Sequence, residues 1–289
     1  MADRPRPGPG EAGPAALGTE AGPAGTRVRR AHHVTTNWLV RREPDPYVEF
    51  RLFCFPYAGA GASAYHRWHA AAPASVHVCA VEPPGRGMRV GEPAQEDFPT
   101  LVRDLADRFE ELEPGAFAFF GHSMGGLVAY ELTRELRERG SRGPTHLVVS
   151  ASAAPGTPRL RRSLAGADDA AVCEELRDLG GTPEWVLDDE DLMAIVLPAV
   201  RADYATLDSY RPSPHAPVDV PITVLGGRDD SVVPPGHLEG WRRATTAGVR
   251  TRLYPGGHFY LHDHVEHILA LVESEVSAGR TRDALGGSR

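Results

Sequence analysis

One stretch, residues 116–139, constrains the fold more than any other part of the chain; its sequence is AFAFFGHSMGGLVAYELTRELRER. It opens with an apolar run at 116–120, which has the length of a buried strand, and from Gly126 onward apolar residues recur at helical spacing. Between them, residues 121–125 fit the pattern G-x-S-x-G. A strand, a sharp turn and a helix are the context in which this pattern forms a strained turn that exposes its serine. The stretch therefore predicts that Ser123 is a nucleophile at the edge of a sheet.

The residues around the serine favour the same hypothesis. Side chains at Gly121 and Gly125 are expected to collide with the neighbouring strand and helix. The amide of Met124 follows the serine at the N-terminus of the predicted helix, where N–H groups are unpaired and negative charge is favoured. On this stretch alone, the alternative is a glycine-rich turn without chemistry.

The rest of the chain alternates predicted strands with predicted helices. Helices are expected at 63–72, at 98–112 and, closing the chain, at 261–276. The predicted strands are 48–55, 76–81, 145–150, 221–225 and 249–254. This alternation predicts an α/β fold with a mostly parallel central sheet and helices on both faces.

The domain organisation follows from the spacing of these elements. About seventy residues separate strands 145–150 and 221–225, far more than a connection needs. Segments 170–179 and 191–204 in this interval have helical character, and Pro198 is expected to kink or break the second. The predicted parts are a disordered Pro/Gly/Ala-rich tail at 1–33, a core at 34–154 and 212–278, a helical cap inserted at 155–211, and a flexible tail at 279–289.

A catalytic serine needs a base, and the base needs a carboxylate that orients it. In α/β hydrolases these groups follow in the order Ser, acid, His, each after a strand. His258 follows the last predicted strand, and both Asp229 and Asp230 follow strand 221–225. We favour Asp230 from the position of the Val-Pro pair at 233–234, and Asp229 stays an alternative. The order predicts an α/β-hydrolase fold with a triad of Ser123, Asp230 and His258 at the carboxyl edge of the sheet.

The loop at 56–62, PYAGAGA, follows the first long predicted strand. No Gly-Lys-Ser/Thr follows its glycines, so it is not a phosphate-binding P-loop. In α/β hydrolases the loop at this place supplies the second N–H of the oxyanion hole. The N–H of Ala58 is the candidate, and a plain strand-to-helix connection is the alternative.

Bulk properties exclude several classes of function. The net charge of −8 argues against a general nucleic-acid binder, and no apolar stretch reaches membrane-spanning length. Three widely spaced cysteines are neither a disulfide framework nor a zinc pattern, and they suit the reducing cytoplasm. The histidines at 258, 262, 264 and 267 resemble a metal cluster by count, but their predicted placement on a turn and a helix face argues against a metal site.

Five patterns, taken in the order of the chain, together carry a family resemblance. They are FCFPYAG at 53–59 with Tyr65 and Trp68 after it, EPPGRG at 82–87 with Arg89, GHSMG at 121–125, LP at 197–198 with RADY at 201–204, and GGHFYL at 256–261. With these patterns the chain resembles the type II thioesterases, the free-standing editing thioesterases of polyketide and nonribosomal peptide assembly lines. It departs from the family at Tyr57-Ala58-Gly59-Ala60-Gly61, where His-Ala-Gly-Gly is expected, and in the length of its N-terminal tail.

The resemblance implies an activity and a partner. The substrate would be an acyl group held as a thioester on the phosphopantetheine arm of an acyl or peptidyl carrier protein, and the role would be to clear stalled or wrongly loaded carriers. Ser123 would attack, His258 would act as base, the N–H groups of Met124 and Ala58 would stabilise the oxyanion, and no metal or cofactor would be required. Two rival hypotheses stay open: an esterase or acyltransferase for small molecules, and a non-catalytic binding protein on a hydrolase scaffold.

Overall fold

The computed structural model describes residues 38–41, 50–112, 115–160, 163–164, 166–212 and 216–286, and at 39–41 and 278–286 it describes the backbone alone. The tail predicted at 1–33 lies outside the described residues. So do residues 48–49, with which the first long predicted strand begins.

The described residues form a seven-stranded sheet in the order β1-β3-β2-β4-β5-β6-β7. The strands are β1 (Leu39–Arg41), β2 (Phe50–Phe55), β3 (Val76–Val81), β4 (Phe117–His122), β5 (His146–Ser150), β6 (Ile222–Gly227) and β7 (Val249–Tyr254). Strand β1 pairs antiparallel with β3, and the other neighbours are all parallel. The predicted mostly parallel sheet is confirmed.

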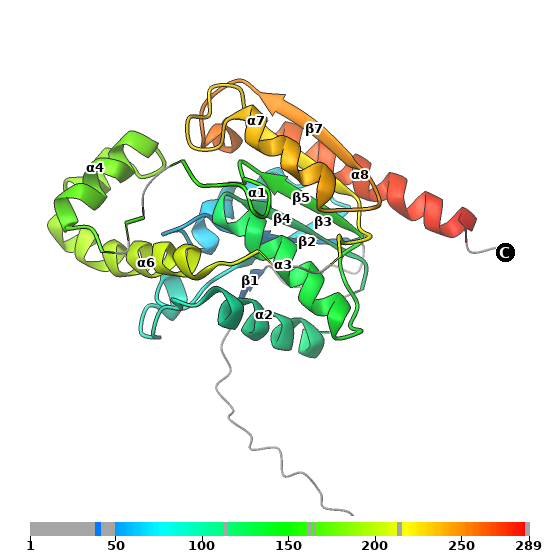
Figure 1. Ribbon diagram of the computed structural model, residues 1–289, viewed down its shortest axis with the longest axis horizontal. Coiled ribbons are helices and arrows are strands. Elements are labelled where there is room, and N and C mark those ends of the chain that lie inside the picture. The colour runs from blue at the N-terminus through cyan, green and yellow to red at the C-terminus, as the bar shows by residue number, and fades with distance from the viewer. Residues whose placement is uncertain are drawn as a thin grey trace, which may run out of the picture. The chain divides into compact units, whose positions relative to one another are not determined.

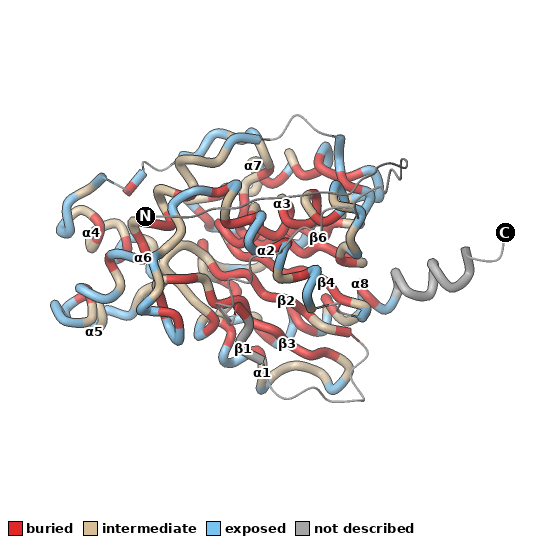
Figure 2. Tube along the Cα trace, turned by 90° about the horizontal axis from the view of Figure 1, so that it is seen from below, coloured by how far each residue is buried: buried red, intermediate tan, exposed pale blue. Residues whose placement is uncertain are grey.

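Helices cover both faces of this sheet (Figure 1). One face packs against α2 (Phe98–Leu112), α3 (Met124–Glu138) and the short α7 (Pro235–Leu238), and the other packs against α1 (His66–Ala71) and α8 (Val265–Gly286). Side chains alternate between the faces, so that in β2 Phe53 joins the α2/α3 layer while Leu52 joins the α1/α8 layer. The central strands are buried on both sides, as Figure 2 shows in red. This double burial explains why the strands are continuous apolar runs in the sequence.

Most elements begin and end close to their predicted positions, with three informative differences. Strands β4 and β6 run two residues further than predicted, to His122 and Gly227, so each leads almost directly into a predicted site residue. The helix predicted at 63–72 is a 3-10 helix at Ala62–Tyr65 followed by α1. Helix α8 starts at Val265 because Tyr260–His262 form a separate 3-10 turn, and it continues to Gly286, past the start of the tail predicted at 279–289.

The interval between β5 and β6 holds three helices: α4 (Asp169–Leu179), α5 (Glu184–Leu187) and α6 (Glu190–Ser209). They share an apolar cluster of their own, to which Val172, Leu187 and Met193 each contribute from a different helix. In Figure 1, α4 and α6 lie together to the left of the sheet. We call the segment 155–211 the cap.

Pro198 was predicted to kink or break the second cap helix, and a break is wrong, because α6 is continuous through the proline. Proline removes one backbone hydrogen bond. The neighbouring turns are held by burial of Leu197 and Val200 in the cap cluster. At its start, the Asp189 carboxylate caps α6 by accepting from the Leu192 N–H at 3.0 Å.

Candidate active site

The strained turn predicted at Ser123 is present between β4 and α3. Ser123 has φ 54° and ψ −118°, a combination outside the regions that L-residues favour. A Cβ at Gly121 or Gly125 would lie less than 3.0 Å from backbone atoms of Gly125 or Phe55, respectively. Helix and strand therefore pack so closely beneath the serine that neither position accepts a side chain.

The loops after β6 and β7 bring the other two predicted residues to this serine. His258 Nε2 lies 3.1 Å from Ser123 Oγ, and His258 Nδ1 lies 2.9 Å from Asp230 Oδ2. The His258 side chain is 5% exposed and that of Asp230 is fully buried. A serine, an imidazole and a buried carboxylate in this order are the arrangement that activates a hydroxyl for attack on a carbonyl.

The structure distinguishes between the two candidate carboxylates. The second oxygen of Asp230, Oδ1, accepts the backbone N–H groups of Val232 at 2.8 Å and Val233 at 2.9 Å. These bonds turn the carboxylate toward the imidazole. Asp229 is exposed, and its backbone N–H donates to the Gly256 carbonyl at 3.0 Å. Asp230 is therefore the residue that faces His258.

The two residues predicted to supply oxyanion donors, Met124 and Ala58, both line the pocket beside Ser123. Met124 is the first residue of α3, where N–H groups have no partner within the helix, and Ala58 lines the same pocket as Ser123. The amides that follow Ala58 are occupied. Gly59 N–H donates to the Asp203 carboxylate at 2.6 Å, and Ala60 N–H donates to the Tyr57 carbonyl at 3.0 Å.

A pocket of about 100 Å³ opens beside Ser123. Its lining is mainly apolar, and it combines core and cap residues: Leu127, Val232 and Val233 from the core, and Leu160, Tyr204 and Leu207 from the cap. Ala151 also lines it and, like Ser123, has a positive φ, of 45°. The cap thus forms one wall of an apolar site, which suits a hydrocarbon chain next to a reacting carbonyl.

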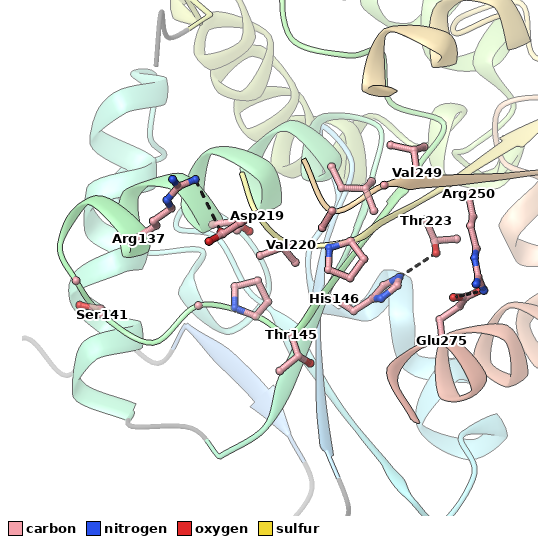
Figure 3. Close-up of a pocket in the computed structure, with 18 residues that line it drawn as sticks. Arg137, Ser141, Thr145, His146, Asp219, Val220, Thr223, Val249, Arg250 and Glu275 are labelled. Carbon is pink, nitrogen blue, oxygen red and sulfur yellow. Dashed lines mark hydrogen bonds and ion pairs between the residues drawn. The ribbon is translucent and has the colours of Figure 1, made fainter. Parts of the chain in front are cut away.

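A larger cavity, of about 810 Å³, is elsewhere (Figure 3). It lies at the opposite edge of the sheet, around the first residues of β5, β6 and β7. Two pairs of its polar side chains bond to each other: His146 Nε2 lies 2.9 Å from Thr223 Oγ1, and Arg250 donates to Glu275 at 2.7 Å. Ligands of parallel sheets bind at the carboxyl edge, so we assign the site to the smaller pocket, where Ser123 lies.

A second hydrogen-bonded chain runs beneath the site and was not expected from the sequence. His122 Nδ1 lies 2.9 Å from Ser150 Oγ, which lies 2.6 Å from the Tyr260 hydroxyl. Burial holds the pKa of His122 well below its usual value, and charge on nearby His258 and His262 lowers it further. His122 therefore stays neutral beside the base.

The structure also contains an ion pair that was not predicted from the sequence, and it joins two of the patterns that carry the family resemblance. Arg86, from EPPGRG, donates to Asp203, from RADY, and both side chains are buried. The sequence does show an arginine in one pattern and an aspartate in the other, but it does not indicate that these two residues pair.

The structure also bears on two other features considered from the sequence, a metal site and a membrane-spanning helix. Among the residues that the structure describes, no group of three or more His, Cys, Asp or Glu side chains is placed to hold a metal ion. His264 instead approaches the Pro255 carbonyl at 3.2 Å, and His262 stacks with Phe259. In the same residues, no helix combines the length and apolar character needed to cross a membrane.

Comparisons with known proteins agree with this geometry. A family model described as Thioesterase domain matches residues 50–276. Gramicidin S biosynthesis protein GrsT of Aneurinibacillus migulanus is 38% identical over 226 residues, covering 78% of this chain and 88% of that protein. Thioesterase PikA5 of Streptomyces venezuelae is 38% identical over 234 residues, covering 80% of this chain and 82% of that protein. The structure of the type II thioesterase BorB from the borrelidin biosynthetic cluster shares 35% identity and a TM-score of 0.76, over 83% of this chain and 97% of that chain.

Proposed function

This chain belongs to the thioesterase domain family, and from that membership we propose that it is a type II thioesterase that removes acyl groups from the phosphopantetheine arm of carrier proteins. The observation that carries the proposal is the hydrogen-bonded chain of Ser123, His258 and Asp230 beside an apolar pocket. Relatives that are named for gramicidin S biosynthesis and for the borrelidin cluster support a role in the biosynthesis of such products.

The proposed reaction begins at Ser123. His258 Nε2 takes the hydroxyl proton while Ser123 Oγ forms a bond to the thioester carbon, and the carbonyl oxygen becomes an oxyanion. Asp230 keeps the imidazole oriented and stabilises its positive charge. The N–H groups of Met124 and Ala58 donate to the oxyanion, which binds them more strongly than the neutral carbonyl does.

The second half of the reaction releases the acyl group. The C–S bond breaks, the pantetheine thiol leaves with the proton from His258, and the acyl group remains as an ester on Ser123. A water molecule then loses a proton to His258 and attacks the ester, which frees the acid and restores the serine. No bound cofactor takes part, because the phosphopantetheine arrives with the substrate.

The surroundings of the site support an acyl substrate. The pocket offers mainly apolar surface to the acyl chain. All three cysteines are free thiols, which supports the cytoplasm as the place of action.

The first experiment compares the same acyl groups on three supports: a carrier protein, a pantetheine thioester and a simple oxygen ester. We expect the highest kcat/KM on the carrier, since a protein partner adds contacts beyond the arm. Ser123→Ala is the matched control, with an expected loss of roughly 10⁴-fold or more in kcat. Equal or better activity on the oxygen esters would make the chain a general small-molecule esterase, and turnover by Ser123→Ala would refute the proposed nucleophile.

A further inference from the structure

The cap helix α6 contacts the proposed oxyanion loop directly, and this contact has a role beyond covering the site. We propose that Asp203 of α6, held by Arg86, is a positioning residue that holds the turn carrying the Ala58 N–H beside Ser123. The inference rests on the proposed function, because it assumes that Ala58 donates to the oxyanion.

The loop conformation is a tight turn whose central peptide is held by Asp203. Ala60 N–H donates to the Tyr57 carbonyl at 3.0 Å, and Gly59 has φ +80°. That hydrogen bond and that φ are those of a type II turn with Ala58 and Gly59 at its centre. Asp203 Oδ2 accepts the Gly59 N–H at 2.6 Å and so fixes the central peptide against α6. The Ala58 N–H belongs to the preceding peptide, between Tyr57 and Ala58, so it keeps its place beside Ser123 only while the whole turn is held.

Arg86 in turn fixes the carboxylate and the other end of the turn. Its Nη2 donates to Asp203 Oδ1 at 2.8 Å, its Nη1 also contacts Asp203 Oδ2, and Nη1 donates to the Ala60 carbonyl at 3.1 Å. The side chains of Arg86 and Asp203 are only 8% and 5% exposed. Buried, bidentate pairs of this kind have a defined geometry. The carboxylate therefore cannot rotate away from Gly59 without leaving a buried charge unpaired.

Packing on either side leaves the loop little freedom. A Cβ at Gly59 would lie less than 3.0 Å from Val200 of α6, so the helix touches the turn without a gap. On the far side, Glu82 Oε1 accepts the Ala62 N–H at 3.1 Å. The turn is thus held between the cap and the loop after β3, and its shape depends on α6 being docked.

The consequence is a link between the cap and the chemistry. When α6 is in place, the turn that carries Ala58 is held beside Ser123. When Asp203 is lost or withdrawn, the turn loses its bond to the cap, and the Ala58 N–H is no longer held in one place relative to the oxyanion. The rate of the chemical step should suffer more than substrate binding, since the oxyanion exists only in the transition state and the tetrahedral intermediate.

The test uses the full chain with Asp203→Asn and with the double variant Arg86→Met/Asp203→Leu. The asparagine keeps the size of the side chain but removes its charge. The double variant replaces a buried ion pair with apolar groups, which proteins often tolerate without loss of stability, yet it gives Gly59 no acceptor. Asp169→Asn is the control, because it removes an ion pair with Arg201 that lies within the cap and does not contact the loop.

Two quantities are measured for each variant: kcat and KM on an acyl-pantetheine thioester, and the inhibition constant of a trifluoromethyl ketone with the same acyl chain. The ketone forms a hemiketal with Ser123 whose oxyanion occupies the proposed hole. Loss of one oxyanion donor costs about 10²–10³ in rate, so misdirection of one should lower kcat by roughly 10- to 100-fold. We expect KM to change less than about threefold, the ketone inhibition constant to rise by the same factor as kcat falls, and the control to match the parent protein.

Three outcomes would overturn the inference. The first is that kcat and ketone inhibition stay within twofold in both variants. The second is that KM rises while kcat is unchanged, which would make Asp203 a substrate-binding or cap-docking residue only. The third is that the double variant recovers the activity lost in Asp203→Asn, which would trace the loss to an unpaired Arg86. Ser123→Ala, assayed alongside, separates the two proposals: retained turnover in that variant refutes the acyl-enzyme mechanism, whereas its loss beside unaffected Asp203 variants refutes the positioning role alone.

Discussion

Backbone strain at Ser123 leads to a prediction about the relative stability of two variants that both lack the proposed nucleophile. The residue has φ 54° and ψ −118°, and it is held there by the close packing of Gly121 and Gly125. Glycine reaches such a conformation at little cost, whereas alanine shares the strain of serine. Ser123→Gly and Ser123→Ala should both be inactive, and they should differ in stability.

The expected size of this difference follows from two opposing effects. A non-glycine residue in a sparsely populated backbone region costs of order 1–3 kcal/mol. Glycine in place of alanine costs roughly 0.5–1 kcal/mol through the entropy of the unfolded chain. Both variants lose the same hydrogen bond between Ser123 Oγ and His258, so this loss cancels in the comparison. Ser123→Gly should therefore be about 1 kcal/mol more stable than Ser123→Ala, which corresponds to about 2–4 °C in Tm.

Denaturant unfolding of the two variants measures the difference, with calorimetry as a second readout. Ala194→Gly is the matched control, because Ala194 is exposed in the interior of α6, where the same exchange should cost about 1 kcal/mol. If Ser123→Gly were less stable than Ser123→Ala by the amount seen in this control, the turn would store no strain and the reasoning would be refuted.

Three further predictions concern the acid, the buried imidazole and the cap. Asp230→Asn should lower kcat by roughly 10³- to 10⁴-fold while Asp229→Asn stays within about twofold, and the reverse ranking in a kinetic assay would reassign the acid. Because the folded state depresses the pKa of His122, its contribution to stability is complete above about pH 6.5 and is lost as the pH falls below that value, by at most about 1.4 kcal/mol per pH unit. His122→Gln should show a weaker loss between pH 7 and pH 5 in denaturant unfolding, and an unchanged pH dependence would contradict this explanation. In hydrogen exchange, the second half of α6 should be protected nearly as well as β5, because Asp203 and Thr206 bond it to the core. Helix α4 should exchange faster than α6, and equal exchange rates in the two helices would contradict this prediction.

The fold could be predicted from the sequence because its elements carry local signals. The strand 76–81 and the helix 98–112 have the same bounds in sequence and structure, since a doubly covered strand is apolar throughout and a helix on its face has apolar residues at helical spacing. The ends of helices and strands were harder to predict where the sequence has no periodic apolar pattern. The turn at Tyr260–His262 carries aromatic residues that could as well begin the following helix, and only packing separates the two.

The residues of the candidate site likewise differ in how clearly the sequence indicates them. Ser123 and His258 were predicted as nucleophile and base because a motif and the chain order point to one residue each. The choice between Asp229 and Asp230 depended on a difference of one residue in a loop, where no periodicity exists. The hydrogen bonds from Val232 and Val233 turn one carboxylate inward and leave the other exposed, and such bonds are formed only after the loop closes on itself.

The sequence by itself therefore determined the order of strands and helices and the strained turn at Ser123, because each depends on residues that are neighbours in the chain, and the chain order predicted the residues proposed as nucleophile and base. Contacts between residues that are far apart in the sequence were decided only by the tertiary structure. The bond from Gly59 to Asp203 joins residues 144 positions apart, and Arg86 reaches Asp203 across 117. A charge in one pattern carries no information about its partner in another, since any of several opposite charges could satisfy it. Burial removes that freedom: once both groups leave water, they must pair with each other, and here the pair holds the loop beside the serine.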